Sequence, residues 1–249
     1  TEYVKFSGDG NAGSTGYVLE PYLQTKDRGI NFFTDDSLFE EVEKFDRMGM
    51  GVTIHVTGDA AVRQMIDAVE RVKKKHGELK ARHQIGHASM IHPDDVPRLR
   101  SLDLTVEFSP VVWFATAFVK AQIPQIGEER MRYWYPMRSV AEHGGRFVIA
   151  SDGPLMWQDT FQRLESAITR VAPDGDTEPL APHEAIDLAA AIKAMTLDSA
   201  YLMNIEEEVG SIEVGKRADM IVLDTNLFEI PSDDIDSSKE LLTVFEGDV

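Results

Sequence analysis

The fold is decided by residues 51–88, GVTIHVTGDAAVRQMIDAVERVKKKHGELKARHQIGHA. The stretch opens with a largely apolar run at Gly51–Val56, which is typical of a buried strand. A helix is predicted next, with Asp59 as its N-cap and Gly77 as its stop, because the apolar residues between them recur at helical spacing. A second strand is predicted at Arg82–Ala88. A strand, a helix and a strand in this order indicate a parallel β/α unit.

The same alternation continues on both sides of this unit. Towards the N-terminus we expect a strand at Tyr3–Ser7, a glycine-rich loop and a helix at Asp36–Met48. Towards the C-terminus we expect a helix from Pro93 to about Ser101, a strand at Leu104–Phe108, a helix ending at His143, a strand at Arg146–Ser151, a helix at Gln158–Val171 and one long helix at His183–Leu202. A complete eight-stranded β/α barrel takes about 250 residues, so about five strands in roughly 200 residues indicate either an open doubly wound sheet or part of a barrel.

The composition changes near Asn204, after the last of these helices. The stretch Gly210–Asp224, GSIEVGKRADMIVLD, is predicted to form a short β-hairpin, and Val244–Val249 a last strand. We therefore expect a large α/β region at residues 1–203 and a small β region at residues 204–249.

Charge and composition exclude several classes of protein. The 249 residues include 43 acidic and 25 basic side chains, which gives a formal net charge of −18. This charge argues against a nucleic-acid partner and against binding to an anionic membrane surface. There is no cysteine, which excludes disulfides, cysteine zinc sites and thiol nucleophiles. With no signal-peptide pattern and no long apolar run, we expect a cytoplasmic protein that acts on a small molecule.

Four chemically active side chains fall at or near the ends of predicted strands: Lys5, His55, His87 and Asp152. The carboxyl ends of parallel strands meet at one edge of a sheet, where β/α barrels carry their active sites. Two imidazoles and a carboxylate suit zinc or a similar divalent ion. Lys5 would join them only as a neutral amine, or as a carbamate that bridges two ions. Each residue alone has an ordinary structural explanation, so the metal hypothesis depends on their coincidence.

Other patterns are weaker. Gly8–Gly13 matches G-x-G-x-x-G after a strand, but no helical periodicity follows, so a nucleotide-binding oxidoreductase is a minor alternative. Three tryptophans, Trp113, Trp134 and Trp157, lie in predicted loops near the candidate site and either line an apolar substrate pocket or simply cover the site. The remaining histidines are interpreted as structural, with the least certainty for His83: His76, His83, His92, His143 and His183.

Five segments together resemble a known family: Val4–Gly10, Ile54–Asp59, Arg82–Ala88, Ser151–Pro154 and Gly210–Asp224. They are similar to the C-terminal half of the amidohydrolase superfamily, specifically the amidohydrolase-3 family that includes N-substituted formamide deformylase. The resemblance covers nearly the whole chain. It implies about strands 4–8 of a metal-dependent hydrolase β/α barrel of the TIM type, followed by the C-terminal segment of a small β-sandwich.

The resemblance also implies roles for the strand-end residues. Lys5 would be the strand-4 lysine that is carboxylated when it bridges two metal ions, and His55 and His87 would be the ligands from strands 5 and 6. Asp152 would be the strand-8 aspartate that binds metal and takes a proton from the attacking water. The implied activity is hydrolysis of a non-peptide C–N bond in a small molecule, with one or two divalent ions, most simply zinc.

Three departures from the family pattern stand out. Gly86 replaces the usual Glu before the strand-6 histidine, Gly153 replaces the usual Trp after the strand-8 aspartate, and the His-x-His of strand 1 is absent. We therefore expect a chain truncated at its N-terminus, inactive or impaired by itself, whose exposed sheet edges a homo-oligomer would cover. The alternative function is a non-catalytic binding or regulatory protein on the same scaffold.

Overall fold

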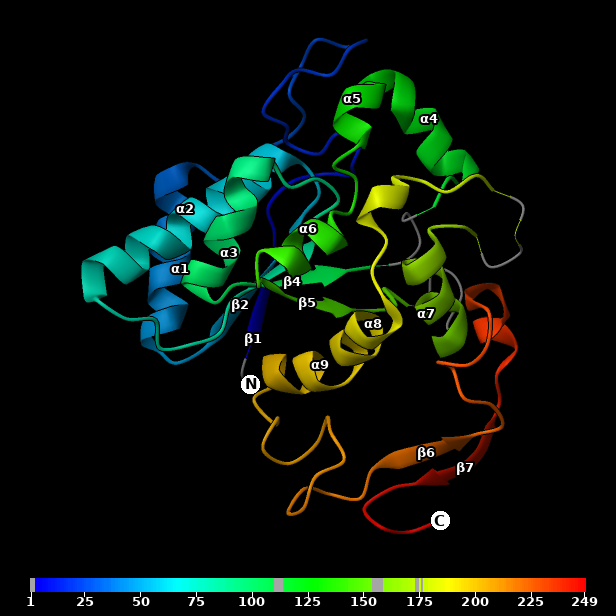
Figure 1. Cartoon of the computed structure of the whole chain (residues 1–249). Coiled ribbons are helices and arrows are strands. Elements are labelled where there is room, and N and C mark those ends of the chain that lie inside the picture. The colour runs from blue at the N-terminus through cyan, green and yellow to red at the C-terminus, as the bar shows by residue number, and fades with distance from the viewer. Residues whose placement is uncertain (1–2, 110–113, 154–158, 173–174, 176) are drawn as a thin grey trace. The chain divides into compact units, whose positions relative to one another are not determined.

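The computed structural model describes residues 3–109, 114–153, 159–172, 175 and 177–249 (Figure 1). The chain packs into two compact units, one formed by Thr1–Phe108 with Ala115–Phe147 and the other by Ser109–Phe114 with Val148–Val249. The expected division between residues 203 and 204 lies inside the second of these units and stays a prediction.

A sheet of five strands confirms the predicted α/β order. Its strands lie side by side in the order of the sequence: β1 (Tyr3–Ser7), β2 (Gly51–Val56), β3 (Gln84–His87), β4 (Thr105–Phe108) and β5 (Arg146–Ile149). The pairs β1–β2, β2–β3 and β3–β4 are parallel. The carboxyl ends of these first four strands therefore share one edge of the sheet.

The helices of the first unit are α1 (Asp35–Arg47), α2 (Asp59–His76), the 3₁₀ turn η1 (Pro93–Asp95), α3 (Val96–Leu102), α4 (Ala117–Ile126), α5 (Glu128–Met131) and α6 (Met137–Glu142). α2 lies against both α1 and α3 (Figure 1). Asp59 is the first residue of α2 and Gly58 is its N-cap, so the predicted cap was one residue too late. Gly77 ends α2 at a φ of 82°, a conformation that glycine adopts without strain.

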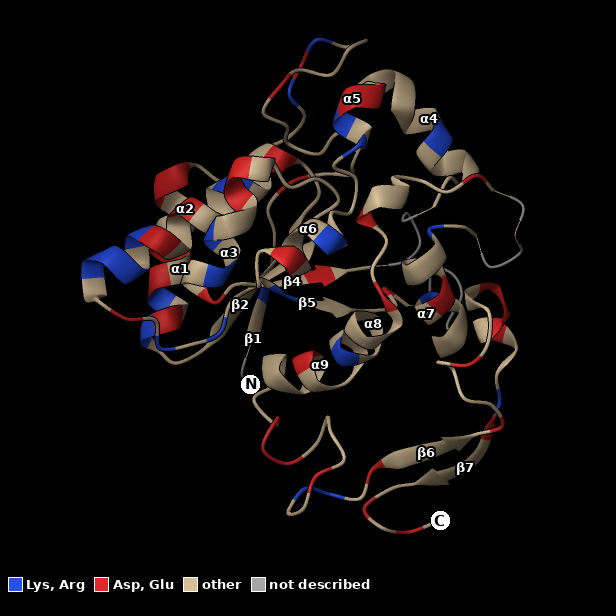
Figure 2. Ribbon diagram, in the orientation of Figure 1, with Lys and Arg blue, Asp and Glu red and all other residues tan. Residues whose placement is uncertain are grey.

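The core of the first unit forms where α2 packs near the sheet. Its apolar face is fully buried over Val62, Met65, Ile66, Val69 and Val72. The opposite face and the last turn of α2 carry its charge, with the basic residues of the last turn at the carboxyl end of the helix (Figure 2). Each buried aliphatic side chain contributes about 1.5–3 kcal/mol relative to an exposed one, so this face holds the helix in place.

A buried hydrogen-bonded pair, Asp46 and His83, lies at the amino end of the sheet. Asp46, in α1, accepts hydrogen bonds from the backbone N–H groups of Lys80 and Ala81 at 2.8 and 3.1 Å and lies 3.1 Å from Nε2 of His83. Nδ1 of His83 accepts the N–H of Val52 at 3.1 Å, so Nε2 is the donor to Asp46. Burial opposes ionisation of Asp46, but the hydrogen bonds from His83 and Arg47 outweigh it and hold its pKa well below the usual range.

We predict that Asp46→Asn lowers the free energy of unfolding at pH 7 by about 2 kcal/mol, because the charge-assisted bond to Arg47 is lost. A carboxyl whose pKa is depressed by folding stabilises the protein above its unfolded value near 3.8, and that contribution disappears as the pH falls through the folded pKa. In urea unfolding, the difference from wild type should be constant from pH 7 to 5 and shrink below about pH 4. A difference that persists unchanged in acid would contradict this explanation.

The second unit contains α7 (Thr160–Thr169), the 3₁₀ turn η3 (Pro182–Glu184), α8 (Leu188–Met195), α9 (Leu197–Leu202), β6 (Met220–Leu223), the 3₁₀ turn η4 (Ser232–Ser237) and β7 (Glu240–Val244). The prediction of one long helix at His183–Leu202 was wrong. Asp187 caps a new helix by accepting the N–H of Ala190, and Thr196 interrupts it with φ −122° and ψ −88°. The Thr196 hydroxyl bonds back to the carbonyl of Ile192, a local bond that competes with regular helix.

The prediction of a hairpin within Gly210–Asp224 was also wrong. β6 pairs antiparallel with the distant β7, and the expected last strand at Val244–Val249 is mostly a turn in which Phe245 and Asp248 bond to each other. Arg217 holds the segment before β6 through ion pairs to Glu208 and Glu246. Apolar side chains of both strands remain exposed, 49% for Ile221 and 66% for Leu241. Among the described helices of the chain, none is long and apolar enough to cross a membrane.

Candidate metal centre

The strand register places predicted site residues on one face of the sheet. Ser7 of β1, His55 of β2 and Gly86 of β3 lie side by side, and Lys5 lies opposite Thr53 two residues earlier. Because side chains alternate along a strand, residues two apart share a face. Lys5 and His55 therefore belong to the same face of the sheet. Lys5 is exposed on this face.

A strained turn brings His87 to His55. In a regular strand His87 would point away from His55, because its neighbour Gly86, and not His87, lies opposite His55. His87 instead has a φ of 68° and forms the centre of a tight turn in which the N–H of Ala88 donates to the carbonyl of Gly86 at 3.0 Å. The two imidazole rings lie with their centroids 4.5 Å apart. Strain of this kind in a non-glycine residue costs about 1–3 kcal/mol and is concentrated at functional sites.

The orientation of His55 is fixed by a backbone carbonyl. Its Nε2 lies 3.3 Å from the carbonyl oxygen of Gly10. A carbonyl can only accept, so Nε2 is the donor, and in the neutral ring Nδ1 is the nitrogen that holds the lone pair. Metal-binding histidines commonly donate their second ring nitrogen to a carbonyl in this way.

These residues fit two nitrogen ligands of a divalent ion. Among the described residues no three His, Cys, Asp or Glu side chains gather closely enough to form a complete metal cluster, so His55 and His87 form at most part of a ligand set. Asp152 belongs to the second unit, where it follows β5, is half-buried and has a φ of 49°. Its role as ligand and proton acceptor stays a prediction.

Of the three tryptophans predicted to lie near the site, only Trp134 belongs to the described residues. Trp113 and Trp157 lie outside the described residues. Trp134 is fully buried and packs edge-on against Tyr135, with the ring centroids 5.6 Å apart. The hydroxyl of Ser89 donates to that of Tyr135 at 2.9 Å, which connects this aromatic pair to the loop after His87. The role of Trp134 in binding substrate stays a prediction.

The other histidines lie outside the candidate centre, and His92 lines the cavity described below. His83, the least certain of these histidines, is buried at the amino end of the sheet. Both of its ring nitrogens bond to protein groups, so its role is structural. His76 ends α2 beside Glu43, His92 is the N-cap of η1, and His143 is the C-cap of α6. His183 lies in η3.

One charged residue of this face was missed from the sequence. Glu107 of β4 lies opposite Gly86 and so belongs to the same row as His55. A Cβ atom at Gly86 would lie 3.3 Å from Oε2 of Glu107. The carboxylate of Glu107 therefore occupies space that a side chain at position 86 would restrict. The sequence did contain a sign of it: a single Glu stands between Val106 and Phe108 in a buried strand, and a charged residue is rarely buried without a partner.

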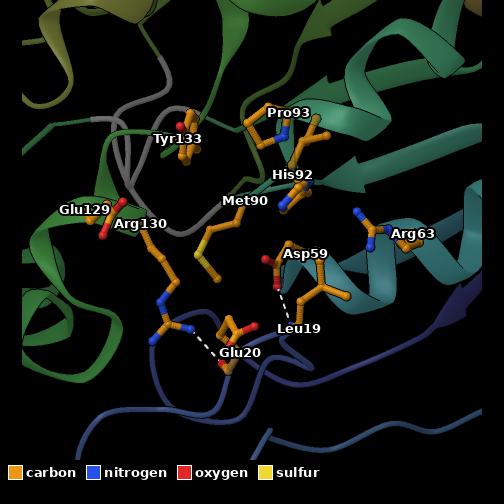
Figure 3. A pocket seen from close by; sticks show the side chains of 11 residues that line it. Leu19, Glu20, Asp59, Arg63, Met90, His92, Pro93, Glu129, Arg130 and Tyr133 are labelled. Carbon is orange, nitrogen blue, oxygen red and sulfur yellow. Dashed lines mark hydrogen bonds between the residues drawn. The ribbon is translucent and has the colours of Figure 1, made fainter.

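A cavity of about 450 Å³ opens in the first unit, beside the loops that follow β2 and β3 (Figure 3). Met90 forms part of its apolar lining, and Asp59 is a buried carboxyl whose pKa is raised by burial. Asp59 accepts the N–H of Leu19 at 2.8 Å, and Arg130 donates to the carbonyl of Glu20 at 2.6 Å. The volume suits a small polar molecule.

The nucleotide-binding interpretation of Gly8–Gly13 was wrong. A dinucleotide site needs a helix whose N-terminus meets the phosphates directly after the glycines. The chain from Gly8 to Thr34 forms turns and isolated bridges, and α1 begins only at Asp35.

The comparisons with known proteins agree with this architecture. The chain belongs to the amidohydrolase family, which residues 2–249 match. It is 27% identical over 238 residues to Protein LONG AFTER FAR-RED 3 of Arabidopsis thaliana, covering 94% of this chain and 40% of that protein. It is 25% identical over 219 residues to N-substituted formamide deformylase of Arthrobacter pascens, covering 88% of this chain and 40% of the deformylase. The predicted resemblance is confirmed.

The fold has a solved counterpart. The structure of an uncharacterized metal-dependent hydrolase from Pyrococcus horikoshii superposes with a TM-score of 0.78 at 24% identity, covering 92% of this chain and 45% of that one. This chain thus spans less than half the length of these relatives.

The strain at His87 predicts an unusual order of stabilities. We expect His87→Gly to be more stable than His87→Ala by about 1 kcal/mol, because glycine adopts a positive φ without cost. The matched pair at His55, a regular strand position, should show the opposite order by about 0.5–1 kcal/mol. Urea unfolding of the four variants measures both differences, and the same order at the two positions would contradict the strained turn.

Proposed function

We propose that this protein is a metal-dependent hydrolase that cleaves a non-peptide C–N bond in a small molecule. The observation that carries the proposal is the pair of imidazoles of His55 and His87, brought together at adjacent strand ends by a strained turn. Membership of the amidohydrolase family supports it, as does the deformylase among its relatives.

We propose further that the five strands are consecutive strands of a β/α barrel of the TIM type and that β6 and β7 belong to a small β-sandwich. Parallel strands that neighbour one another in chain order are the arrangement of such a barrel. The exposed apolar side chains of β6 and β7 support the second part, because a two-stranded sheet is only marginally stable without further packing.

The chain's residues then divide the work. His55, through Nδ1, and His87 would hold the ion, with Lys5 as a third ligand in its neutral or carboxylated form. When bound, a divalent ion such as zinc polarises the substrate carbonyl and lowers the pKa of a water molecule. Asp152 would bind the ion, accept a proton from the attacking water and pass it to the leaving nitrogen. Because the sequence contains no His-x-His pair, we expect turnover by this chain to be slow.

Zinc binding tests the centre directly. We predict that the protein binds zinc and that His55→Ala or His87→Ala weakens this binding at least about 100-fold, because each removes a ligand. Competition with a chromophoric chelator measures the affinity. His143→Ala is the matched control, because His143 is exposed at the end of α6 and should leave zinc affinity unchanged.

The same titration separates the alternative function. A non-catalytic binding or regulatory protein on this scaffold, having lost the chemistry, would bind little zinc, and its weak binding would be equal in wild type, His55→Ala and His143→Ala. That outcome would contradict the proposed hydrolase.

The role of Asp152 has its own test. We predict that Asp152→Asn lowers kcat about 100-fold or more at unchanged zinc content, because the amide cannot take the proton from water. Turnover is followed by mass spectrometry of the amine released from a panel of N-formyl and N-acyl amines over hours, so that a slow reaction is detected. If turnover survives in the zinc-loaded variant, Asp152 does not have this role.

A further inference from the structure

The carboxylate of Asp9 joins three separate segments of the first unit. It follows β1, is 2% exposed, and accepts the N–H groups of Thr57, Gly58 and Tyr17 at distances between 2.8 and 3.1 Å. Thr57 and Gly58 are the two residues that follow β2, and Tyr17 belongs to the loop that returns from β1. One buried side chain thus fixes where β2 ends and where the glycine-rich loop passes over it.

The residue after Asp9 is the one that holds His55. The carbonyl of Gly10 accepts the hydroxyl of Thr57 at 2.8 Å and faces Nε2 of His55 at 3.3 Å. The N–H of Gly8, on the other side of Asp9, donates to the carbonyl of His55 at 2.8 Å. Asp9 therefore lies between Gly8 and Gly10, which both bond to His55. It also accepts the N–H groups of Thr57 and Gly58, which follow His55 in the chain.

The glycines of this loop are explained by the same arrangement. A Cβ atom at Gly8 would lie 2.7 Å from the side chain of Val56, and one at Gly10 would lie 2.2 Å from the hydroxyl of Thr15. The backbone must pass close to β2 for the Gly10 carbonyl to reach the imidazole. Glycine is thus required at Gly8 by the side chains of β2 and at Gly10 by Thr15 of the same loop, which explains the G-x-G pattern without a nucleotide.

We propose that Asp9 is a positioning residue for the metal centre, which fixes the Gly10 carbonyl and through it the orientation and the Nε2–H tautomer of His55. The part of this proposal that concerns the metal rests on the proposed function. The effect of Asp9 on the imidazole of His55 does not depend on it. Asp9 is not proposed to touch substrate or metal, because both of its carboxylate oxygens accept backbone N–H groups.

The three N–H groups that converge on Asp9 require an acceptor with two free oxygens. Burial raises the pKa of Asp9 to about 7, against the lowering effect of its N–H donors, so the charged form is held at a cost. A carboxylate accepts N–H groups on both oxygens at once, whereas an amide would turn an NH₂ group towards one of these donors. The three N–H donors converge on an acceptor that only Asp supplies at this length.

The test compares Asp9→Asn with wild type by two measurements. Long-range ¹H–¹⁵N correlation of the imidazoles, with His55 assigned from His55→Ala, reports its tautomer in the metal-free protein. Competition with a chromophoric chelator reports zinc affinity. In Asp9→Asn we expect His55 to change from the Nε2–H tautomer to a mixture of both, and zinc affinity to fall about tenfold or more.

Two further variants make the result specific. Asp46→Asn changes a buried carboxylate of the same unit at the other end of β2, so it should lower the thermal midpoint and leave both the His55 tautomer and zinc affinity unchanged. Thr57→Val removes the hydroxyl bonded to the Gly10 carbonyl and keeps the Asp9 carboxylate. It should change both readouts in the same direction as Asp9→Asn, by less, and it decides the question if Asp9→Asn does not fold.

The outcomes separate this proposal from the proposed function. If wild type binds no zinc but Asp9→Asn alters the His55 tautomer, the metal-dependent function fails and the positioning role of Asp9 stands. If wild type binds zinc and both Asp9→Asn and Thr57→Val keep its affinity and tautomer within twofold, the function stands and the positioning role is overturned. Equal changes in Asp46→Asn would also overturn it, because they would reflect general loss of stability.

Discussion

Parallel pairing of β1, β2 and β3 is the constraint on which the candidate site depends. The connections between these strands return the chain to the same end of the sheet each time, so the last residues of all three lie at one edge. The register then sets which residues meet: His55 lies between Ser7 and Gly86. A shift of one residue in β2 would turn His55 to the other face, because side chains alternate. The buried apolar residues of β2 prevent such a shift, so the packing of the core also fixes the chemistry.

Alternation alone would still have kept the two histidines apart. The left-handed conformation of His87 ends the regular strand one residue early and turns the imidazole to the side of His55. The structure therefore combines a rigid element, which sets the distance between strands, with a single strained residue, which sets the direction of one side chain. The absence of a side chain at Gly86 leaves space on the same face, and Glu107 from the next strand leans into it.

How much of this could be predicted depended on the range of the interactions. The helix at Asp59–His76 and the strands on either side of it have strong local patterns, and their prediction is confirmed within a few residues. The pairing of β6 with β7 joins segments separated by a long irregular stretch, which no local pattern reports. Likewise His55 lies near the end of β2 and His83 just before β3, and it is the parallel pairing of these strands that places the two histidines at opposite ends of the sheet.

The two ends of β2 show why one of these histidines is structural and the other is a candidate ligand. At the amino end, His83 bonds Val52 through Nδ1 and Asp46 through Nε2, so both nitrogens serve the fold. At the carboxyl end the nearby buried carboxylate, Asp9, does not bond the imidazole but the backbone around it. His55 instead meets a neutral carbonyl, which defines the donor nitrogen without adding a charge. By accepting the proton of Nε2, the Gly10 carbonyl orients the ring and leaves the lone pair on Nδ1, the nitrogen that is free to bind a metal ion.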